Sequence, residues 1–216
     1  MSAIGLDLPW RVHEGGYAVV LKRTHMRVAI SGTRGEWEEE YLVGQGMLLE
    51  VEPLKNFDGL LCREFVTVSD AEGALSFVER FGPLTDKGLY GEGESVGEIV
   101  RQAWLMRRFI EAGSRGKPAL KDMLPPPGEA LGTIDVTLVP RVHQSRPEMR
   151  FAPRDLLTGI WIQFGQAAAG GLKIRRCGQC SALFEAGPGW GRRLDAKFCS
   201  EEHKIAFHSM ARKRRG

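Results

Sequence analysis

The pattern of apolar and polar residues along the chain predicts strands first and helices after them. Short β-prone runs indicate a hairpin over residues 17–31, interrupted by a polar four-residue break, and Gly32–Gly35 as a turn. Further strands follow, and a later alternation predicts a separate pair. The expected strands are Tyr17–Leu21, Met26–Ile30, Trp37–Val43, Met47–Val51, Thr133–Arg141 and Met149–Phe151.

Apolar residues at helical spacing predict three main helices. The first runs from an N-cap at Ser69 or Asp70 to about Phe81, and the second spans roughly Glu94–Ala112. Pro153 suits the first turn of the third helix, which Gly170-Gly171 ends. The residues expected to face inward on the first helix are Ala71, Ala74, Leu75, Val78 and Phe81. Those on the second are Val96, Ile99, Ala103, Met106 and Ile110, with Val100 and Trp104 widening the face.

These elements predict an α+β fold with a β-rich N-terminus and a helical larger domain. We expect that domain to cover residues 1–171, and a small C-terminal module to cover residues 172–216. A hydrophobic content of 43% and a charged content of 26% are ordinary for a soluble globular protein. No signal peptide or membrane span is recognisable in the sequence, so we expect a cytoplasmic protein without a membrane partner.

Four residues near the C-terminus carry the clearest chemistry: Cys177, Cys180, Cys199 and His203. They read C-x2-C, a spacer of 18 residues, then C-x3-H, a spacing typical of a tetrahedral zinc site. A cytoplasmic location favours metal over disulfides here. Since protein ligands fill all four positions, we expect one structural Zn²⁺ and not a catalytic one. The alternative is that these cysteines are unmetallated core residues.

The surrounding residues predict how the ligands are held. Gly178 allows the first pair to form a knuckle whose N–H groups point at sulfur, and residues 181–185 form the return strand. Ser200 is a good N-cap, which places Cys199 and His203 at the start of a C-terminal helix. A knuckle, a hairpin and such a helix make the treble-clef plan. His208 competes with His203 as fourth ligand but lies off the face of Cys199.

The module resembles the C-terminal zinc finger of a family of poorly characterised bacterial proteins. The resemblance rests on Arg176–Cys180, Phe184, Arg192–Ser200 and the basic helix after His203, about 40 residues in all. Broader relatives are the CGNR-type zinc-finger proteins, proposed as stress-induced transcriptional regulators. This chain has His203 where most relatives have cysteine, and Lys204-Ile205-Ala206 where Gly-Asn-Arg would follow. DNA contacts attributed to that signature therefore do not carry over.

Charge is unevenly distributed, and this indicates an anionic partner. Residues 171–216 hold 11 Lys/Arg and 4 Asp/Glu, a net charge of +7, whereas residues 1–170 carry −4. Basic side chains so placed can neutralise the phosphates of DNA or RNA, and Trp190 can stack on a base. The candidate nucleic-acid-binding residues are Arg192, Arg193, Lys197, Lys204, Arg212, Lys213, Arg214 and Arg215. The competing interpretation is a solvated tail that complements the helix dipole.

Two other functions remain open. A treble-clef module can serve as a rigid contact for a protein partner, without binding nucleic acid. A nuclease-like enzyme is disfavoured, because no catalytic histidine and no open metal position is evident. Asp86, Glu92 and Glu94 form an acidic cluster without a suitably spaced partner, and the lone Cys62 is expected to be a core thiol. We therefore predict no catalytic residues.

Overall fold

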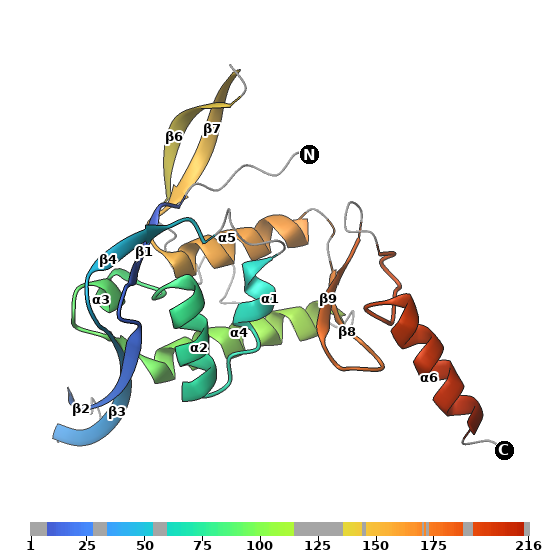
Figure 1. The fold of residues 1–216 in the computed structure, drawn as a ribbon, viewed down its shortest axis with the longest axis horizontal. Helices are drawn as coiled ribbons and strands as arrows, with labels where there is room; N and C mark the ends of the chain where they lie inside the picture. Colours follow the sequence, from blue (N-terminus) through green and yellow to red (C-terminus); the bar gives the residue numbers. More distant parts are fainter. Residues whose placement is uncertain are drawn as a thin grey trace. The chain divides into compact units, whose positions relative to one another are not determined.

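In the computed structural model of the chain, four strands among the described residues precede the first helix and the later strands lie between helices, and this mixture of strands and helices confirms the α+β fold (Figure 1). The structure describes residues 8–27, 34–53, 60–114, 136–143, 146–169, 171, 173–187 and 192–213. The chain divides into two compact units. One holds residues 4–106 and 134–162, and the other holds residues 1–3, 107–133 and 163–216. The domain boundary after residue 171 stays a prediction.

The longest strands form one hairpin that differs from the predicted one. Strand β2 (Tyr17–Arg27) is continuous through the polar residues 22–25 and pairs antiparallel with β3 (Arg34–Gly44). The predicted partner, Met26–Ile30, was wrong, because its first residues extend β2 instead. Main-chain hydrogen bonds along the ladder do not depend on the side chains, so a polar break need not end a strand. Of the predicted turn, residues 32 and 33 lie outside the described residues.

Shorter strands complete the pairing of the first half. Strand β1 (Trp10–His13) pairs antiparallel with β4 (Leu48–Val51), while the two-residue β5 (Glu94–Ser95) joins β3. Strands β6 (Val136–His143) and β7 (Arg146–Pro153) are antiparallel, with Leu138 opposite Phe151. The predicted pairing of these two segments is confirmed.

Helix α2 (Ala71–Phe81) begins and ends where the sequence predicts. The Asp70 carboxylate accepts a hydrogen bond from the Gly73 N–H at 2.8 Å, and this bond lowers the pKa of Asp70. Gly82 follows with a φ of 92°, and a Cβ there would lie 2.8 Å from the Trp10 ring. Only glycine fits both constraints, so it sets where the chain turns away from α2.

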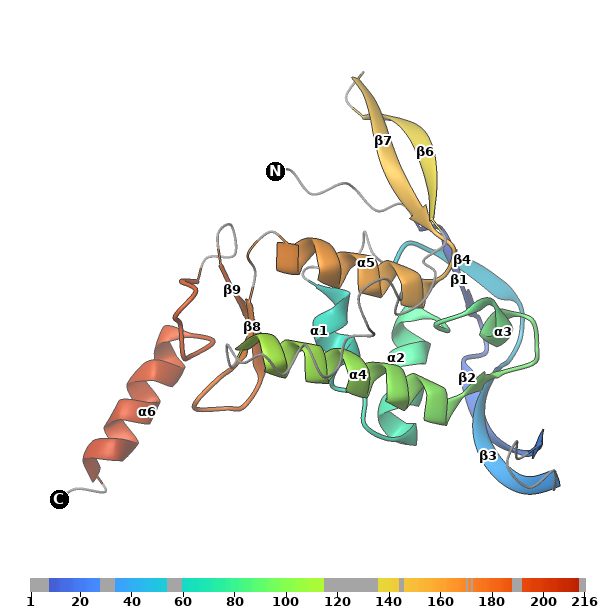
Figure 2. The same ribbon diagram turned by 180° about the vertical axis from the view of Figure 1, so that it is seen from behind.

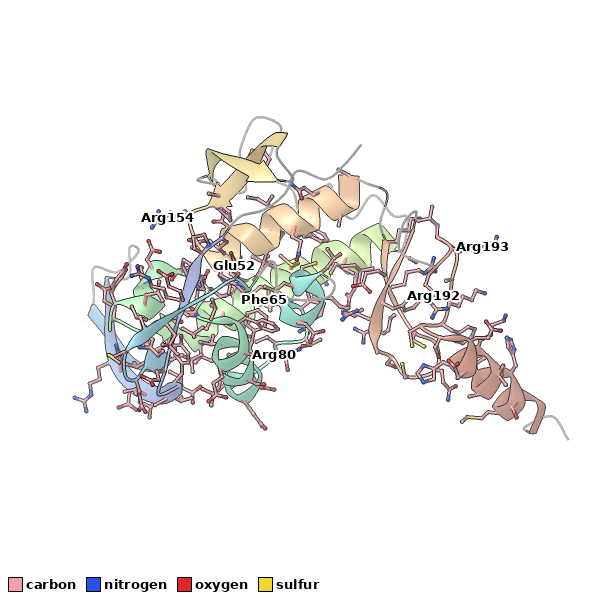
Figure 3. All side chains as sticks on the ribbon, turned by 45° about the horizontal axis from the view of Figure 1, so that its top comes forward. Glu52, Phe65, Arg80, Arg154, Arg192 and Arg193 are labelled. Carbon is pink, nitrogen blue, oxygen red and sulfur yellow. The ribbon has the colours of Figure 1, made fainter. Side chains whose placement is uncertain are left out.

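The apolar stripes of the helices meet in one core. Short α1 (Leu61–Phe65) contributes Phe65, whose ring centroid lies 5.2 Å from that of Phe77 (Figure 3). Phe77 is buried on α2, where we expected Ala71 and Leu75, which are only half-buried. Cys62 is fully buried, as predicted. The other buried helix residues of this core are Leu61, Ala74, Val78, Phe81, Val96, Ile99, Ala103, Met106, Leu156 and Ile160.

Two long helices run side by side in both views (Figures 1 and 2): α4 (Val96–Ser114) and α5 (Leu156–Ala169). The Trp161 indole N–H donates to the Gln102 side chain at 3.3 Å between them. Trp104 is 49% exposed, so it does not widen the buried face of α4 as expected. Among the described residues, no helix combines the length and apolar character that a membrane span requires.

Helix α5 starts later than predicted. Pro153 is the last residue of β7 and not part of the first turn. The Asp155 side chain instead accepts a hydrogen bond from the Thr158 N–H at 2.8 Å, as an N-cap does. A carboxylate that satisfies a free N–H of the first turn defines a helix start better than the fixed φ of proline.

The short helix α3 (Asp86–Leu89) lies between α2 and α4, where the sequence predicts no helix, and its start is held by Glu94. Glu94 is 6% exposed, and its carboxylate accepts a hydrogen bond from the Leu84 N–H at 2.7 Å and others from Thr85. Burial raises the pKa of Glu94 to about 7 despite these bonds, with a further contribution from Asp155. The predicted acidic cluster therefore loses Glu94, which belongs to the core.

Glu94 should make stability fall as the pH rises. In the unfolded chain the carboxyl loses its proton near pH 4.5, in the folded protein near pH 7, so the folded state binds more protons between these values. The free energy of unfolding should therefore decrease across this window, by on the order of 3 kcal/mol. Glu94→Gln, which imitates the protonated acid, should lack this decrease. Urea unfolding from pH 5 to pH 8 measures both proteins, and parallel curves would contradict the assignment.

Candidate metal centre

The first two cysteines lie in the turn of a small hairpin. Strand β8 (Lys173–Arg176) leads into Cys177, and β9 (Leu183–Ala186) returns antiparallel to β8, which confirms the predicted return strand. The Ser181 N–H donates to the Cys177 carbonyl at 3.0 Å, and Ser181 has a φ of 60°. This left-handed residue closes the knuckle, so both sulfur atoms point to the same side as the following helix.

The second pair of ligands lies at the start of α6 (Glu201–Lys213). The Ser200 hydroxyl accepts a hydrogen bond from the His203 N–H at 3.2 Å, which confirms Ser200 as the N-cap. Cys199 is not in the helix itself but directly before the cap. The cap fixes the first turn, and the Cys199 sulfur then lies 2.9 Å from His203 Nδ1.

All four predicted ligand residues converge on one point. Their ligand atoms lie within 4.8 Å of one another, which is a group that can hold a metal ion. Cys180 Sγ lies 3.7 Å from Cys199 Sγ, and Cys177 Sγ lies 3.8 Å from His203 Nδ1. A tetrahedron with Zn–S bonds of about 2.3 Å and Zn–N bonds of about 2.0–2.1 Å has edges of about 3.8 and 3.5 Å. Two of these three separations match such a tetrahedron, the Cys199–His203 separation is shorter, and the donor set is one that suits zinc.

Main-chain N–H groups point at sulfur, as the knuckle predicts. Gln179 and Cys199 donate to Cys177 Sγ at 3.5 and 3.4 Å. Burial raises the pKa of the Cys177 thiol, but N–H groups from Cys180, Cys199 and Gln179 outweigh it and lower this pKa to about 6. Burial and the neighbouring sulfur atoms raise the pKa of Cys199 to about 11. A divalent cation among these sulfur atoms would reverse that repulsion and favour thiolates.

The apolar core of this module is very small. Among the described residues its buried cluster holds Cys177, Phe184 and Ala186, against which Ala196, Phe198 and Cys199 pack, and Ile174 is buried on β8. Cys180 is exposed and Cys199 is half-buried. So few apolar contacts cannot order a segment of this length, and the metal-ligand bonds would supply the missing stabilisation.

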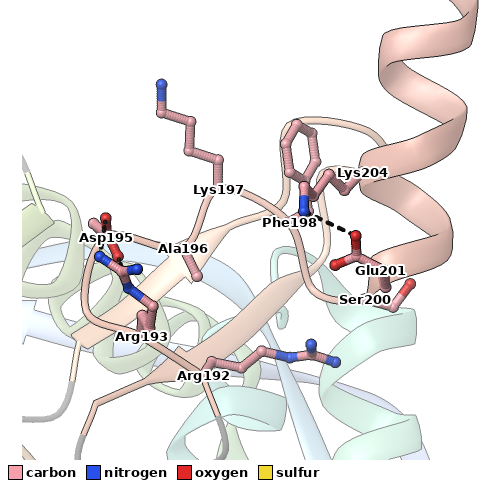
Figure 4. Close-up of a pocket in the computed structure, with 9 residues that line it drawn as sticks. All are labelled: Arg192, Arg193, Asp195, Ala196, Lys197, Phe198, Ser200, Glu201 and Lys204. Atoms are coloured by element: carbon pink, nitrogen blue, oxygen red, sulfur yellow. Dashed lines mark hydrogen bonds and ion pairs between the residues drawn. The ribbon is translucent and has the colours of Figure 1, made fainter.

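Four of the eight candidate nucleic-acid-binding residues line one pocket beside this centre (Figure 4): Arg192, Arg193, Lys197 and Lys204. Arg192 and Arg193 lie in the loop between β9 and α6 (Figure 3), and Lys204 lies on α6. Arg212 and Lys213 are in the last turn of α6, but their side chains lie outside the described residues, as do Arg214, Arg215 and Trp190.

Histidines other than His203 have other surroundings. The His208 ring lies 5.9 Å from the ring centroid of Phe198 and 5.7 Å from that of Phe207, so it belongs to an aromatic cluster. His13 Nδ1 lies 3.3 Å from the Gly46 carbonyl oxygen. Sequence reasoning missed the cluster of Phe198, Phe207 and His208. The i, i+9 separation of Phe198 and Phe207 crosses a loop–helix boundary, and no single periodicity connects them.

Comparison of the chain with family models, with curated proteins and with solved structures found no match. The resemblance to CGNR-type zinc fingers therefore stays a prediction, and the site has to be interpreted from its own geometry.

The metal site predicts that Cys180→Ser releases the metal. One thiolate of four is lost, and the module has too little core to remain ordered without the ion. Elemental analysis should find close to one zinc per chain in the wild type and far less in the variant. Limited proteolysis should then cut residues 172–216, while the helices of the unit that holds residues 4–106 and 134–162 persist.

Cys62→Ala is the matched control, because Cys62 is a buried cysteine outside the ligand group. It should lose some stability through the cavity it leaves but keep its zinc. A wild-type protein that is fully folded without metal, or a Cys180→Ser protein with unchanged zinc, would refute the site.

Proposed function

We propose that the chain is a zinc-binding protein in which one structural Zn²⁺ organises a nucleic-acid-binding surface. Cys177, Cys180, Cys199 and His203 would hold the ion, since their ligand atoms, three sulfurs and one nitrogen, lie within 4.8 Å of one another. With four protein ligands no position is left for a reacting water, so the proposal assigns the metal no catalysis. A role in bacterial transcriptional regulation follows from the family resemblance alone.

The observation that carries the proposal is the pocket beside the metal group. It gathers basic side chains from the segment before α6 and from the first turn of α6, and such a cluster suits phosphate groups. Arg193 pairs with Asp195 at 3.1 Å, and Lys204 pairs with Glu201 at 2.8 Å. Within the described residues, no ion pair is found for Arg192 or Lys197. The pocket therefore keeps a net positive charge for an anionic partner.

A protein partner is the alternative, and one observation favours it. Helix α6 exposes three large apolar side chains, with Ile205 at 63%, Phe207 at 41% and Met210 at 52%. A surface of this kind on a short helix is a common feature of protein contacts. If the wild type were retained on neither DNA nor RNA at low salt, this interpretation would replace the first.

Binding to duplex DNA should weaken steeply with salt. Phosphate contacts release counterions, and each contact contributes about −0.9 to the slope of log affinity against log salt. Replacing both Arg192 and Arg193 by Ala should weaken binding to all sequences alike and flatten the slope by up to about two units. Fluorescence anisotropy with a mixed-sequence duplex measures both quantities.

The single variants refine this expectation. Arg193 is already neutralised by Asp195, so Arg192→Ala should flatten the slope more than Arg193→Ala. Deleting residues 212–216 should also flatten the slope without loss of zinc, because no ligand lies beyond His203. A slope that neither the substitutions nor the deletion changes would contradict phosphate binding by this surface.

A further inference from the structure

The pocket beside the metal group has the size and the two-sided chemistry of a nucleotide site. It is an open hollow of about 430 Å³, a volume within the range of about 300–1,000 Å³ typical of small-molecule pockets. Its lining combines basic side chains with the ring of Phe198 (Figure 4). On the basis of the proposed function, we infer that this pocket is a subsite for one unpaired nucleotide of a single-stranded nucleic acid.

The charged side of the pocket suits a strand more than an isolated phosphate. Arg192 extends toward Ser200 at the start of α6, whereas Lys197 projects from the opposite arm of the same loop (Figure 4). Two separated cations match successive phosphates along a backbone. Arg193 and Lys204, paired with Asp195 and Glu201, shape the rim and add little net charge.

The aromatic side of the pocket supplies what a base needs. Phe198 is half-buried and lines the pocket, and its ring centroid lies 5.2 Å from that of Phe207. Stacking on an aromatic ring is worth about 1–3 kcal/mol per base and does not depend on base identity. The bases of a duplex are stacked on one another and cannot enter a pocket, so this feature favours a single strand.

Hydrogen bonds hold the pocket loop in place before any ligand binds. The Gly178 N–H donates to the Lys197 carbonyl at 2.9 Å, and the Arg175 guanidinium donates to the Leu194 carbonyl at 2.7 Å. The Ala196 N–H donates to the Arg193 carbonyl at 3.0 Å. Gly178 lies within the metal knuckle, and Cys199 follows Phe198 directly. The pocket is therefore built on the same backbone that carries the metal ligands.

The test compares three fluorescein-labelled probes of about 12 nucleotides on the full-length, zinc-loaded protein. They are an oligothymidylate, its duplex with the complementary strand, and an abasic oligomer that keeps every phosphate. The wild type should bind the oligothymidylate at least about fivefold more tightly than either of the others. An oligouridylate of equal length shows whether RNA or DNA is preferred, and tight binding of either supports the site.

Variants then separate the two sides of the pocket. Arg192→Ala and Lys197→Ala should each weaken binding of the oligothymidylate and flatten its salt slope by about 0.7. Lys173→Ala removes the same charge from an exposed side chain on β8, outside the pocket, and should change binding much less. Phe198→Leu keeps apolar volume but should abolish the preference over the abasic probe. Zinc content of each variant verifies that the module is folded, and the abasic probe tests stacking without any mutation.

Two results overturn the inference but leave the proposed function intact. One is equal binding of duplex and single strand, or of the abasic and normal probes. The other is an Arg192→Ala or Lys197→Ala protein that behaves like Lys173→Ala. If the wild type binds none of the probes at about 50 mM salt, nucleic-acid binding itself is refuted, and the subsite with it.

Discussion

The convergence of three cysteine sulfurs and one histidine nitrogen is the constraint on which the C-terminal module depends. Among the described residues its buried cluster consists of Cys177, Phe184 and Ala186, and two of the pieces that it joins are short strands. Such a core cannot offset the conformational entropy of ordering the segment. Coordination bonds among Cys177, Cys180, Cys199 and His203 would therefore hold the knuckle against the start of α6.

The proposed binding surface depends on the same attachment. The pocket is formed by residues 192–200 and the first turn of α6, two consecutive segments that also carry the ligands Cys199 and His203. Hydrogen bonds from Gly178 and Arg175 to the loop carbonyls transmit that geometry to the pocket lining. Binding of nucleic acid and binding of metal should therefore be linked, because the metal would hold the pocket-lining residues in place without itself contacting or reacting with the nucleic acid.

The larger core contains a buried carboxylate, that of Glu94. Glu94 is enclosed beside the turn that joins α2 and α3, where it accepts hydrogen bonds from Leu84 and Thr85. These bonds fix the loop. Burial destabilises the charged carboxylate more than the hydrogen bonds stabilise it, so the pKa of Glu94 rises to about 7. A residue that the sequence presents as part of a surface acidic cluster is thus a structural group whose protonation is linked to folding.

By itself, the sequence determined those features that depend on residues close together in the chain. The ligand spacing, the caps at Asp70 and Ser200, and the end of α2 at Gly82 each follow from local geometry and are confirmed. The pairing of β1 with β4 and of β5 with β3, the burial of Phe77 and Glu94 and the exposure of Trp104 were not predicted, because each depends on partners far along the chain. The start of α5 was also missed, although its cap at Asp155 is local. The pocket at Phe198 is lined by residues 192–204, which are close together in the chain, but the hollow between them exists only once this segment has folded against the first turn of α6.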